Sequence, residues 1–298
     1  MQTIHMALCQ GHWTGDQHTT KDLYRGLVDE AVQAGATLIC LPEFSLLPYF
    51  PGIRNNPEQA LWEETLQAGA TAEFCSTLSK QYGITLIGSI FERDGHNYWD
   101  TAVIYNDGQL QHYTRKVHIP SGEGYHETDY FNGYDAFPVH DLGDVQIAAP
   151  TCYDQWFPEL ARIYAMNGAE LIYYPTAIGS EPTAPDFDSK DAWQTVMRGH
   201  AVANGVFVAA CNRIGKENNV TFYGSSFICD PTGKIIAEAS RDQDEVVHVV
   251  LDADQRAQYL DLFPLLHQRK PQHYGRLLEK IESNPPERWH NELKENNG

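Results

Sequence analysis

Short apolar runs alternate with segments of helical period along the first ninety residues of the chain. The runs "IHMALC", "TLICLPE" and "ITLIGSIFE" are predicted strands. Between them lie "KDLYRGLVDEAVQAGA" and "PEQALWEETLQAGATAEFCSTLSKQYG", which have helical spacing, and Gly35 stands where a C-cap glycine ends the first helix. This order predicts strand, helix, strand, helix and strand, an arrangement in which helices cover a sheet.

The later part of the chain resumes this alternation and adds hairpins. The predicted strands are "VQIAAPTC", "AELIYYPTA" and "VFVAAC", and the predicted helices are "FPELARIYAMNG" and "SKDAWQTVMRGHAVANG". Hairpin turns are expected around Asp107-Gly108 and around the segment from Asp230 to Gly233. We therefore expect an α/β protein with two mixed β-sheets covered by helices, rather than a barrel or a simple doubly wound sheet.

Composition and charge narrow the functional classes. The 298 residues are 42% hydrophobic and 20% charged, which is typical of a globular protein, and one large domain is expected. The formal net charge of -19 argues against a nucleic-acid partner and favours a cationic or neutral small substrate. No run approaches the roughly 18 apolar residues of a membrane span, and "MQTIHMALCQ" does not have the pattern of a secretory signal. A cytoplasmic protein without a membrane partner is expected.

The six cysteines are scattered without a CxxC pair, so neither structural zinc nor a disulfide framework is expected. Four of them lie in or beside apolar runs, where a thiol packs as a small hydrophobe: Cys9, Cys40, Cys211 and Cys229. Cys152 differs, because it follows the apolar run "VQIAAPT" and is surrounded by aromatic and acidic residues.

Three polar residues closely follow predicted strands, namely Glu43, Lys116 and Cys152. Open α/β sheets place ligands at such strand ends. Together these groups could perform the steps of one reaction. The carboxylate takes the thiol proton, the thiolate attacks a carbon atom, and the ammonium stabilises the oxyanion. We expect the ammonium to lower the pKa of the thiol, and burial to raise the pKa of the carboxyl.

The residues alone leave other interpretations open. A glutamate after a proline is often a solvated loop acid, and a lysine beside Arg115 often lies at the surface. Cysteine hydrolases also use histidine as the base, and His118 and His126 are sequence neighbours of Lys116 and Glu127. For these two histidines a structural or pocket-lining role is the favoured interpretation.

Three segments resemble, in order, the three catalytic motifs of the nitrilase superfamily of carbon-nitrogen hydrolases: "LPEF", "RKVHIP" and "CYDQWFPE". The resemblance implies a catalytic triad of Glu43, Lys116 and Cys152. It also implies that Glu127, in "GYHETDYF", lies beside the triad and orients the lysine and the substrate. No metal or organic cofactor is implied.

The resemblance also implies the architecture. A four-layer αββα sandwich is expected, together with assembly into a homodimer or a higher homo-oligomer. The carbon-nitrogen hydrolase domain is predicted over residues 1–279. Residues 280–298 are predicted to form a polar tail that frays or reaches across a partner subunit.

Within the superfamily, "DQWFPE", "YPTAIGSEP" and "FYGSSF" most resemble N-carbamoylputrescine amidases. These convert N-carbamoylputrescine to putrescine, carbon dioxide and ammonia, a step of polyamine synthesis. One alternative is an N-carbamoyl amino acid amidase of the β-ureidopropionase kind or an aliphatic amidase. Another is a catalytically silent homologue that acts as a binding protein.

A putrescine-like substrate needs acids or aromatic faces for its distal ammonium. The loop "SEPTAPDFDS" offers acids, whereas a carboxylate substrate would need an arginine or paired amides there. The candidate substrate-binding residues are Glu181, Asp186 and Asp188 for the ammonium, Tyr49, Trp156 and Tyr174 for the walls, and the backbone N–H of Tyr153 for the oxyanion.

Overall fold

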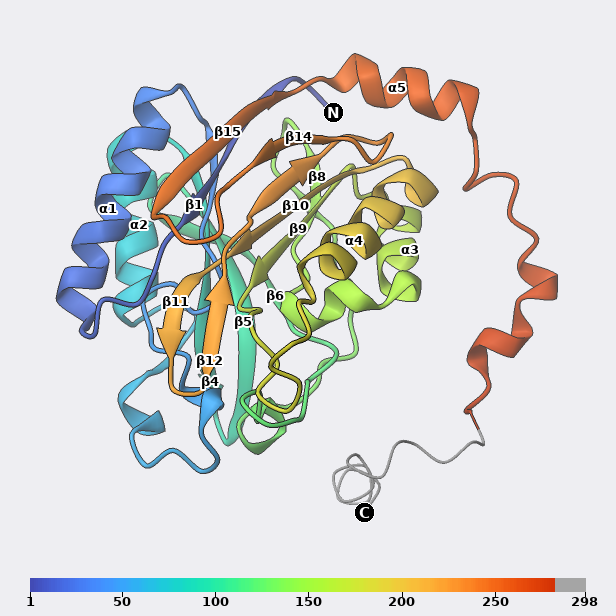
Figure 1. Cartoon of the computed structure of the whole chain (residues 1–298). Coiled ribbons are helices and arrows are strands. Elements are labelled where there is room, and N and C mark those ends of the chain that lie inside the picture. The colour runs from blue at the N-terminus through green and yellow to red at the C-terminus, as the bar shows by residue number, and fades with distance from the viewer. Residues whose placement is uncertain (282–298) are drawn as a thin grey trace.

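In the computed structural model, which describes residues 1–281, two mixed β-sheets pack face to face between two pairs of helices (Figure 1). The first sheet runs in the order β15 (Glu245–Leu251), β1 (Ile4–Gln10), β2 (Leu38–Cys40), β4 (Thr85–Asp94), β5 (Asn97–Asn106) and β6 (Gln109–Arg115), with β3 (Glu63–Glu64) beside β4. The second runs β14 (Ile235–Glu238), β13 (Phe227–Cys229), β10 (Phe207–Asn212), β9 (Leu171–Thr176), β8 (Gln146–Ala148) and β7 (His140–Asp141). A separate ribbon pairs β11 (Ile214–Glu217) with β12 (Val220–Tyr223).

Helices α1 (Gln17–Gln33) and α2 (Ala70–Tyr82) cover the first sheet, while α3 (Pro158–Met166) and α4 (Lys190–Asn204) cover the second (Figure 1). Strand alternation explains the layers, since Met6 and Leu8 of β1 face the second sheet while Ala7 and Cys9 face α1. The predicted four-layer αββα sandwich with two mixed sheets is confirmed.

The boundaries of α1 follow local sequence signals. The side chain of Asp16 caps the helix by accepting hydrogen bonds from the backbone N–H groups of His18 and Thr19, over 2.9 and 3.0 Å. The helix ends before Gly35, which has φ +91° and adopts the left-handed conformation that the sequence predicted. The predicted hairpins also form, because Asp107-Gly108 joins β5 to β6 and Asp230 to Gly233 joins β13 to β14.

The prediction of a continuous helix from Pro57 to Gly83 is wrong in its first half. That half contains a short 3-10 turn, η2 (Gln59–Leu61), and strand β3, and α2 begins only at Ala70. The carboxylate of Glu64 turns back and accepts hydrogen bonds from Thr71 N–H, which starts α2. Gly69 has φ +146°, and a side chain there would collide with the Glu64 carboxylate.

The sheets bring distant segments to a common edge. Strands β2 and β4 of the first sheet are parallel, as are β8, β9 and β10 of the second. Strand β5 is antiparallel to β4, and β6 is antiparallel to β5. Strand β6 therefore runs in the same direction as β4 and β2 and ends at the same edge of the sheet. The segments that follow β2, β6, β8, β9 and β10 therefore converge, which is how the fold assembles the site.

After β15 the chain forms α5 (Ala253–Leu262) and two short 3-10 turns, η5 (Pro271–His273) and η6 (Gly275–Leu278). This segment runs along the outside of the sandwich and away from it, shown in red in Figure 1. No residue of α5 is buried. The predicted tail, residues 280–298, lies outside the described residues from position 282 onward, and the homo-oligomer stays a prediction. No helix in residues 1–281 has the length and apolarity that a membrane crossing needs.

Candidate active site

Cys152 stands at the start of a five-residue 3-10 turn, η4 (Cys152–Trp156), directly after β8. Its φ is +43°, a conformation that costs energy for a residue with a side chain and is concentrated at functional sites. Asp154 holds this turn, because its carboxylate accepts from Thr151 N–H at 3.3 Å and from His118 N–H at 2.8 Å. The same carboxylate therefore joins the cysteine turn to the segment that follows Lys116.

Lys116 is completely buried and its ammonium is surrounded by three carboxylates. Its Nζ lies 2.9 Å from Glu43 Oε1, 2.5 Å from Glu127 Oε2 and 3.1 Å from Asp100 Oδ2. The carboxylate oxygens lie within 4.8 Å of one another, a spacing that could hold a metal ion. Here the lysine ammonium supplies the cation, since it is within hydrogen-bond distance of all three.

Burial and charge set the protonation of these groups. Burial raises the pKa of Glu43 well above its ordinary value, opposed by Lys116 and reinforced by Asp100 and Glu127. Burial alone would lower the pKa of Lys116, but the surrounding carboxylates outweigh it and raise that pKa. The lysine is therefore held as an ammonium, while Glu43 is a stronger base than an ordinary glutamate.

The sequence predicted a lowered pKa for the Cys152 thiol, and this prediction is wrong. Burial raises the pKa of Cys152 well above its ordinary value, and Glu43 adds to the rise, while Lys116 opposes it without prevailing. The free site therefore holds a neutral thiol, and a base must remove its proton during the reaction. Glu43 Oε2 is available for this role, because it is buried without a hydrogen-bond partner among the described residues.

A cavity of about 720 Å³ leads to the cysteine and to Glu127. Its wall includes three of the predicted substrate-binding residues, Tyr153, Trp156 and Glu181. Cys152 is 6% exposed, and its thiol lies 3.8 Å from the carbonyl oxygen of Ala177, which also lines the cavity. The structure thus brings the predicted nucleophile and three predicted contact residues to one cavity.

Two predicted wall residues lie elsewhere. Tyr49 is buried behind Glu127 and donates a hydrogen bond of 2.8 Å from its hydroxyl to Glu127 Oε1. Tyr174 points to the opposite face of β9, in the apolar core that α3 and α4 cover. The assignment of Tyr174 to the pocket is therefore corrected, because strand alternation directs its ring to the helix layer.

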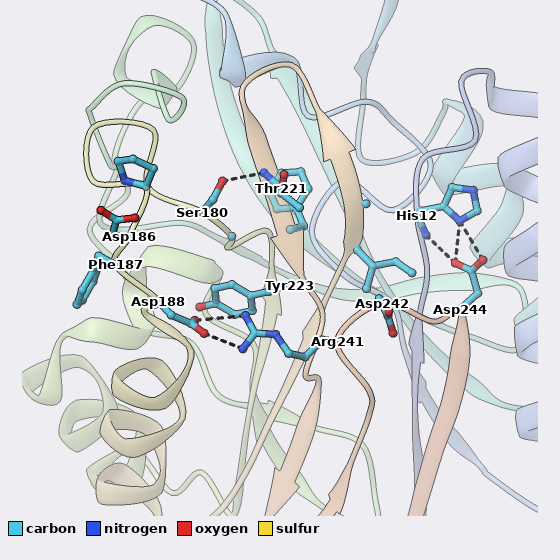
Figure 2. Close-up of a pocket in the computed structure, with 15 residues that line it drawn as sticks. His12, Ser180, Asp186, Phe187, Asp188, Thr221, Tyr223, Arg241, Asp242 and Asp244 are labelled. Atoms are coloured by element: carbon cyan, nitrogen blue, oxygen red, sulfur yellow. Dashed lines mark hydrogen bonds and ion pairs between the residues drawn. The ribbon is translucent and has the colours of Figure 1, made fainter.

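Asp186 and Asp188 line a different cavity, of about 640 Å³ (Figure 2). Figure 2 shows Asp188 turned toward Arg241, whose Nη1 lies 2.8 Å from Asp188 Oδ2. Of the residues in this loop, Phe187 lines both cavities. The assignment of these two acids to the ammonium end of the active-site cavity is therefore corrected.

The two histidines differ in position. His118 stacks on Phe157 with 3.6 Å between ring centroids and bonds Asp154 through Nδ1 at 2.8 Å, so it supports the cysteine turn. His126 lines the cavity and its Nδ1 accepts a hydrogen bond from Arg54 Nε at 3.3 Å. Both placements agree with the structural and pocket-lining roles that the sequence favoured.

The sequence reasoning did not single out four positions that contact the candidate site or line its cavity: Asp100, Asp154, Arg213 and Arg54. Asp100 sits inside a strand, where nothing in the local pattern marks it as part of the site. Asp154, by contrast, lies inside the quoted motif "CYDQWFPE" and could have been found there. Arg213 and Arg54 are joined to the site only by tertiary contacts.

Comparison with known proteins identifies the family of this chain. The carbon-nitrogen hydrolase family profile matches residues 5–260. A citrullinase from Francisella tularensis is 38% identical over 286 residues, covering 94% of this chain and 100% of that protein. An N-carbamoylputrescine amidase from Solanum tuberosum is 37% identical over 293 residues, covering 95% and 97%.

A solved structure of a carbon-nitrogen hydrolase from Helicobacter pylori matches with a TM-score of 0.87 and 30% identity, covering 94% of this chain and 100% of that one. This chain therefore belongs to the carbon-nitrogen hydrolase family of the nitrilase superfamily and is a hydrolase acting on carbon-nitrogen bonds.

Proposed function

We propose that this protein hydrolyses the carbon-nitrogen bond of an N-carbamoyl amine, with Cys152 as the nucleophile. One observation carries the proposal. Cys152 and Glu127 line the same cavity, and Lys116 joins Glu127 to Glu43, whose second carboxylate oxygen has no partner among the described residues. These contacts support a nucleophile at a substrate-sized cavity, with a base and a fixed cation joined to it through Glu127.

The proposed reaction has two halves. Glu43 takes the proton of Cys152, the sulfur attacks the carbamoyl carbon, and Glu43 returns the proton to the departing amine. The enzyme then carries a carbamoyl thioester. Water, deprotonated by Glu43, attacks this thioester, restores the thiol and releases carbamate, which breaks down to carbon dioxide and ammonia.

Negative charge develops on the carbamoyl oxygen in both halves. Lys116 is the proposed cation beside this oxygen, and the backbone N–H of Tyr153 is the proposed second donor. Tyr153 is the second residue of η4, where the first turn leaves N–H groups without an intrahelical acceptor. Preorganised donors of this kind stabilise the charged transition state more than the neutral substrate.

N-carbamoylputrescine is the proposed substrate. Glu181 and Trp156 line the cavity and offer a carboxylate and an aromatic face to a distal ammonium. The formal net charge of -19 attracts a cation, and the relative from Solanum tuberosum is named for this substrate. This reaction would place the protein in polyamine synthesis, with a small molecule as its partner and the cytoplasm as its location.

A ureido amino acid such as citrulline is the second candidate, because Arg54 lines the same cavity. The sequence suggested that this end of the pocket offers acids only, and the structure adds a guanidinium. Citrulline carries the same ureido group on a short chain with an additional carboxylate, which an arginine binds well. The relative from Francisella tularensis is named for hydrolysis of citrulline.

Ammonia release from N-carbamoylputrescine, citrulline, N-carbamoyl-β-alanine and acetamide tests these assignments, with Cys152→Ala as the inactive control. Highest kcat/KM for N-carbamoylputrescine supports the first candidate, and highest kcat/KM for citrulline supports the second. Activity on acetamide or N-carbamoyl-β-alanine alone would reject both. Turnover by Cys152→Ala would reject the nucleophile itself.

Arg54→Gln separates the two candidates further. Loss of a hydrogen bond to a charged group costs about 1.5–3 kcal/mol, so kcat/KM for citrulline should fall roughly 10- to 100-fold if its carboxylate binds there. The value for N-carbamoylputrescine should not fall. Arg93→Gln is the matched control, because Arg93 pairs with Glu63 and does not line the cavity.

A further inference from the structure

The buried cluster around Lys116, which we call the lysine cluster, contains more carboxyl groups than ammonium groups. Three carboxylates, Glu43, Asp100 and Glu127, share the single ammonium of Lys116, and all four side chains are fully buried. An uncompensated buried charge costs several kcal/mol, and a carboxyl group avoids the cost by keeping its proton. At least one proton is therefore expected to be shared among the three carboxyl groups.

The hydrogen-bond donors indicate which group keeps the proton. Glu127 accepts from Lys116 and from the hydroxyl of Tyr49, and Asp100 accepts from Lys116 at 3.1 Å and from Ser89 Oγ at 3.4 Å. Glu43 accepts from Lys116 through Oε1, and its Oε2 has no donor among the described residues. Donors stabilise the ionised form, so Glu43 is the group of the three that most readily takes up the proton, and it acts as a base once it has released that proton.

Asp100 is also tied to the segment that carries Glu43. The Ser89 hydroxyl, which donates to Asp100, accepts a hydrogen bond of 3.2 Å from the backbone N–H of Phe44. Phe44 directly follows Glu43 and has φ +47°, so this bond fixes a strained turn. Asp100 thus reaches Glu43 by two routes, through the Lys116 ammonium and through Ser89.

We propose that Asp100 is a positioning residue for the reaction: it holds Lys116 and Glu43 in place, and its negative charge strengthens Glu43 as the base that deprotonates Cys152. This role rests on the proposed function, because it assumes that Glu43 exchanges a proton with the thiol. The direction of the Glu43 pKa agrees, since Asp100 is among the groups that raise it.

The test is the pH dependence of Cys152 alkylation by iodoacetamide in the wild type and in Asp100→Asn. Alkylation reports thiol deprotonation without any substrate. Asparagine keeps the shape and an oxygen acceptor for Lys116 but removes the charge beside Glu43. The acid limb of the profile should move to lower pH by about one unit, and the plateau rate should fall about three- to tenfold because the base is weaker.

Asp94→Asn is the matched control, because it removes the same charge from an exposed side chain that pairs with Arg115 outside the cluster. Its profile should coincide with that of the wild type. An unmoved acid limb in Asp100→Asn, or a shift to higher pH, overturns the proposal. Ammonia release by the wild type is measured in parallel, and its absence would count against the proposed function rather than against Asp100.

A second measurement applies if Asp100→Asn does not fold. Infrared difference spectra of the wild type across the neutral pH range should contain the band of a protonated carboxyl group. The band should be absent from Glu43→Gln and present in Cys152→Ala. Absence of the band from the wild type, or its persistence in Glu43→Gln, also overturns the proposal.

Discussion

The guanidinium of Arg213 holds the backbone of Glu43 across 170 positions of sequence, with Nη1 donating to the Glu43 carbonyl oxygen at 3.2 Å. The same group donates to the carbonyl oxygens of Phe44 and Leu47, and Glu217 neutralises its charge at 2.5 Å. Arg213 is 1% exposed. The carboxylate that we propose as the base is therefore carried by the loop after β2, and that loop is clamped by the residue that follows β10 of the second sheet.

Replacement of Arg213 should disable the site and weaken the fold. Arg213→Ala leaves Glu217 as a buried charge without its partner and three carbonyl groups without their donor, so a loss of about 3–5 kcal/mol in unfolding free energy is expected. Arg213→Lys keeps the charge but not the fork of donors, and should retain folding with reduced kcat. Urea unfolding and ammonia release measure the two effects, and a fully active Arg213→Ala would contradict the clamp.

Cys152 should react with iodoacetamide faster than Cys75. A difference of roughly tenfold or more is expected, because a neighbouring base assists deprotonation of the Cys152 thiol. Both thiols have a pKa raised by burial, but Cys75 lies at 0% exposure in the core, while Cys152 lines the cavity. Peptide mass spectrometry after timed alkylation compares them within one sample. Equal rates would remove the support for an activated nucleophile.

Glu43→Gln should abolish turnover and stabilise the protein. The pKa of Glu43 is raised in the folded state, so its contribution to stability is fully present below the unfolded pKa and is lost as pH rises through the folded pKa. Glutamine does not ionise, so Glu43→Gln removes the loss of stability at neutral pH. Lys116 still has the carboxylates of Asp100 and Glu127 as partners. A gain of about 0.5–2 kcal/mol at neutral pH is expected, vanishing at acid pH. Urea unfolding at both pH values measures it, and equal gains would refute this account.

Tyr49→Phe should lower activity without unfolding the protein. Burial raises the pKa of Glu127, and the Tyr49 hydroxyl is one of two donors that oppose this rise by stabilising the ionised form beside Lys116. A hydrogen bond of this kind contributes about 1 kcal/mol, so kcat should fall roughly fivefold with little change in KM. Tyr174→Phe is the matched control, because that ring lies in the helix-facing core, and its kinetics should match the wild type.

Glu181→Gln and Asp188→Asn should differ in their effect on substrate binding. Glu181 lines the active-site cavity, so its neutralisation should raise KM for N-carbamoylputrescine roughly tenfold, while kcat stays similar. Asp188 lines the other cavity and pairs with Arg241 (Figure 2). The KM of Asp188→Asn for N-carbamoylputrescine should therefore equal that of the wild type. That exposed pair contributes at most about 1 kcal/mol to stability. A larger KM effect from Asp188→Asn would reverse the assignment.

The alternation of apolar runs and helical segments was sufficient to predict most elements, because strand and helix periods are local properties of the chain. The segment between Pro57 and Gly69 was the exception. Its apolar spacing resembles a helix, yet Glu64 pairs in β3 and turns back to start α2. That choice depends on the edge of β4, which lies beyond the segment itself.

The motifs likewise predicted Glu43, Lys116, Glu127 and Cys152, because each follows an apolar run or stands in a recognisable segment. Alternation along β9, once its register is known, sends Tyr174 to the helix layer. The turn of the loop between β9 and α4 sends Asp186 and Asp188 to the second cavity. The residues next to Tyr174, Asp186 and Asp188 in the sequence do not determine where these side chains point.

The sequence by itself determined which reactive groups the protein has and in which order they occur, because motifs are local. Only the tertiary structure decided their charge states. Asp100 joins the lysine cluster through the pairing of β5 with β6, and burial, rather than the neighbouring ammonium, sets the pKa of Cys152. Protonation depends on solvent exclusion and on every charge within a few ångströms, and those neighbours come from five separate segments of the chain.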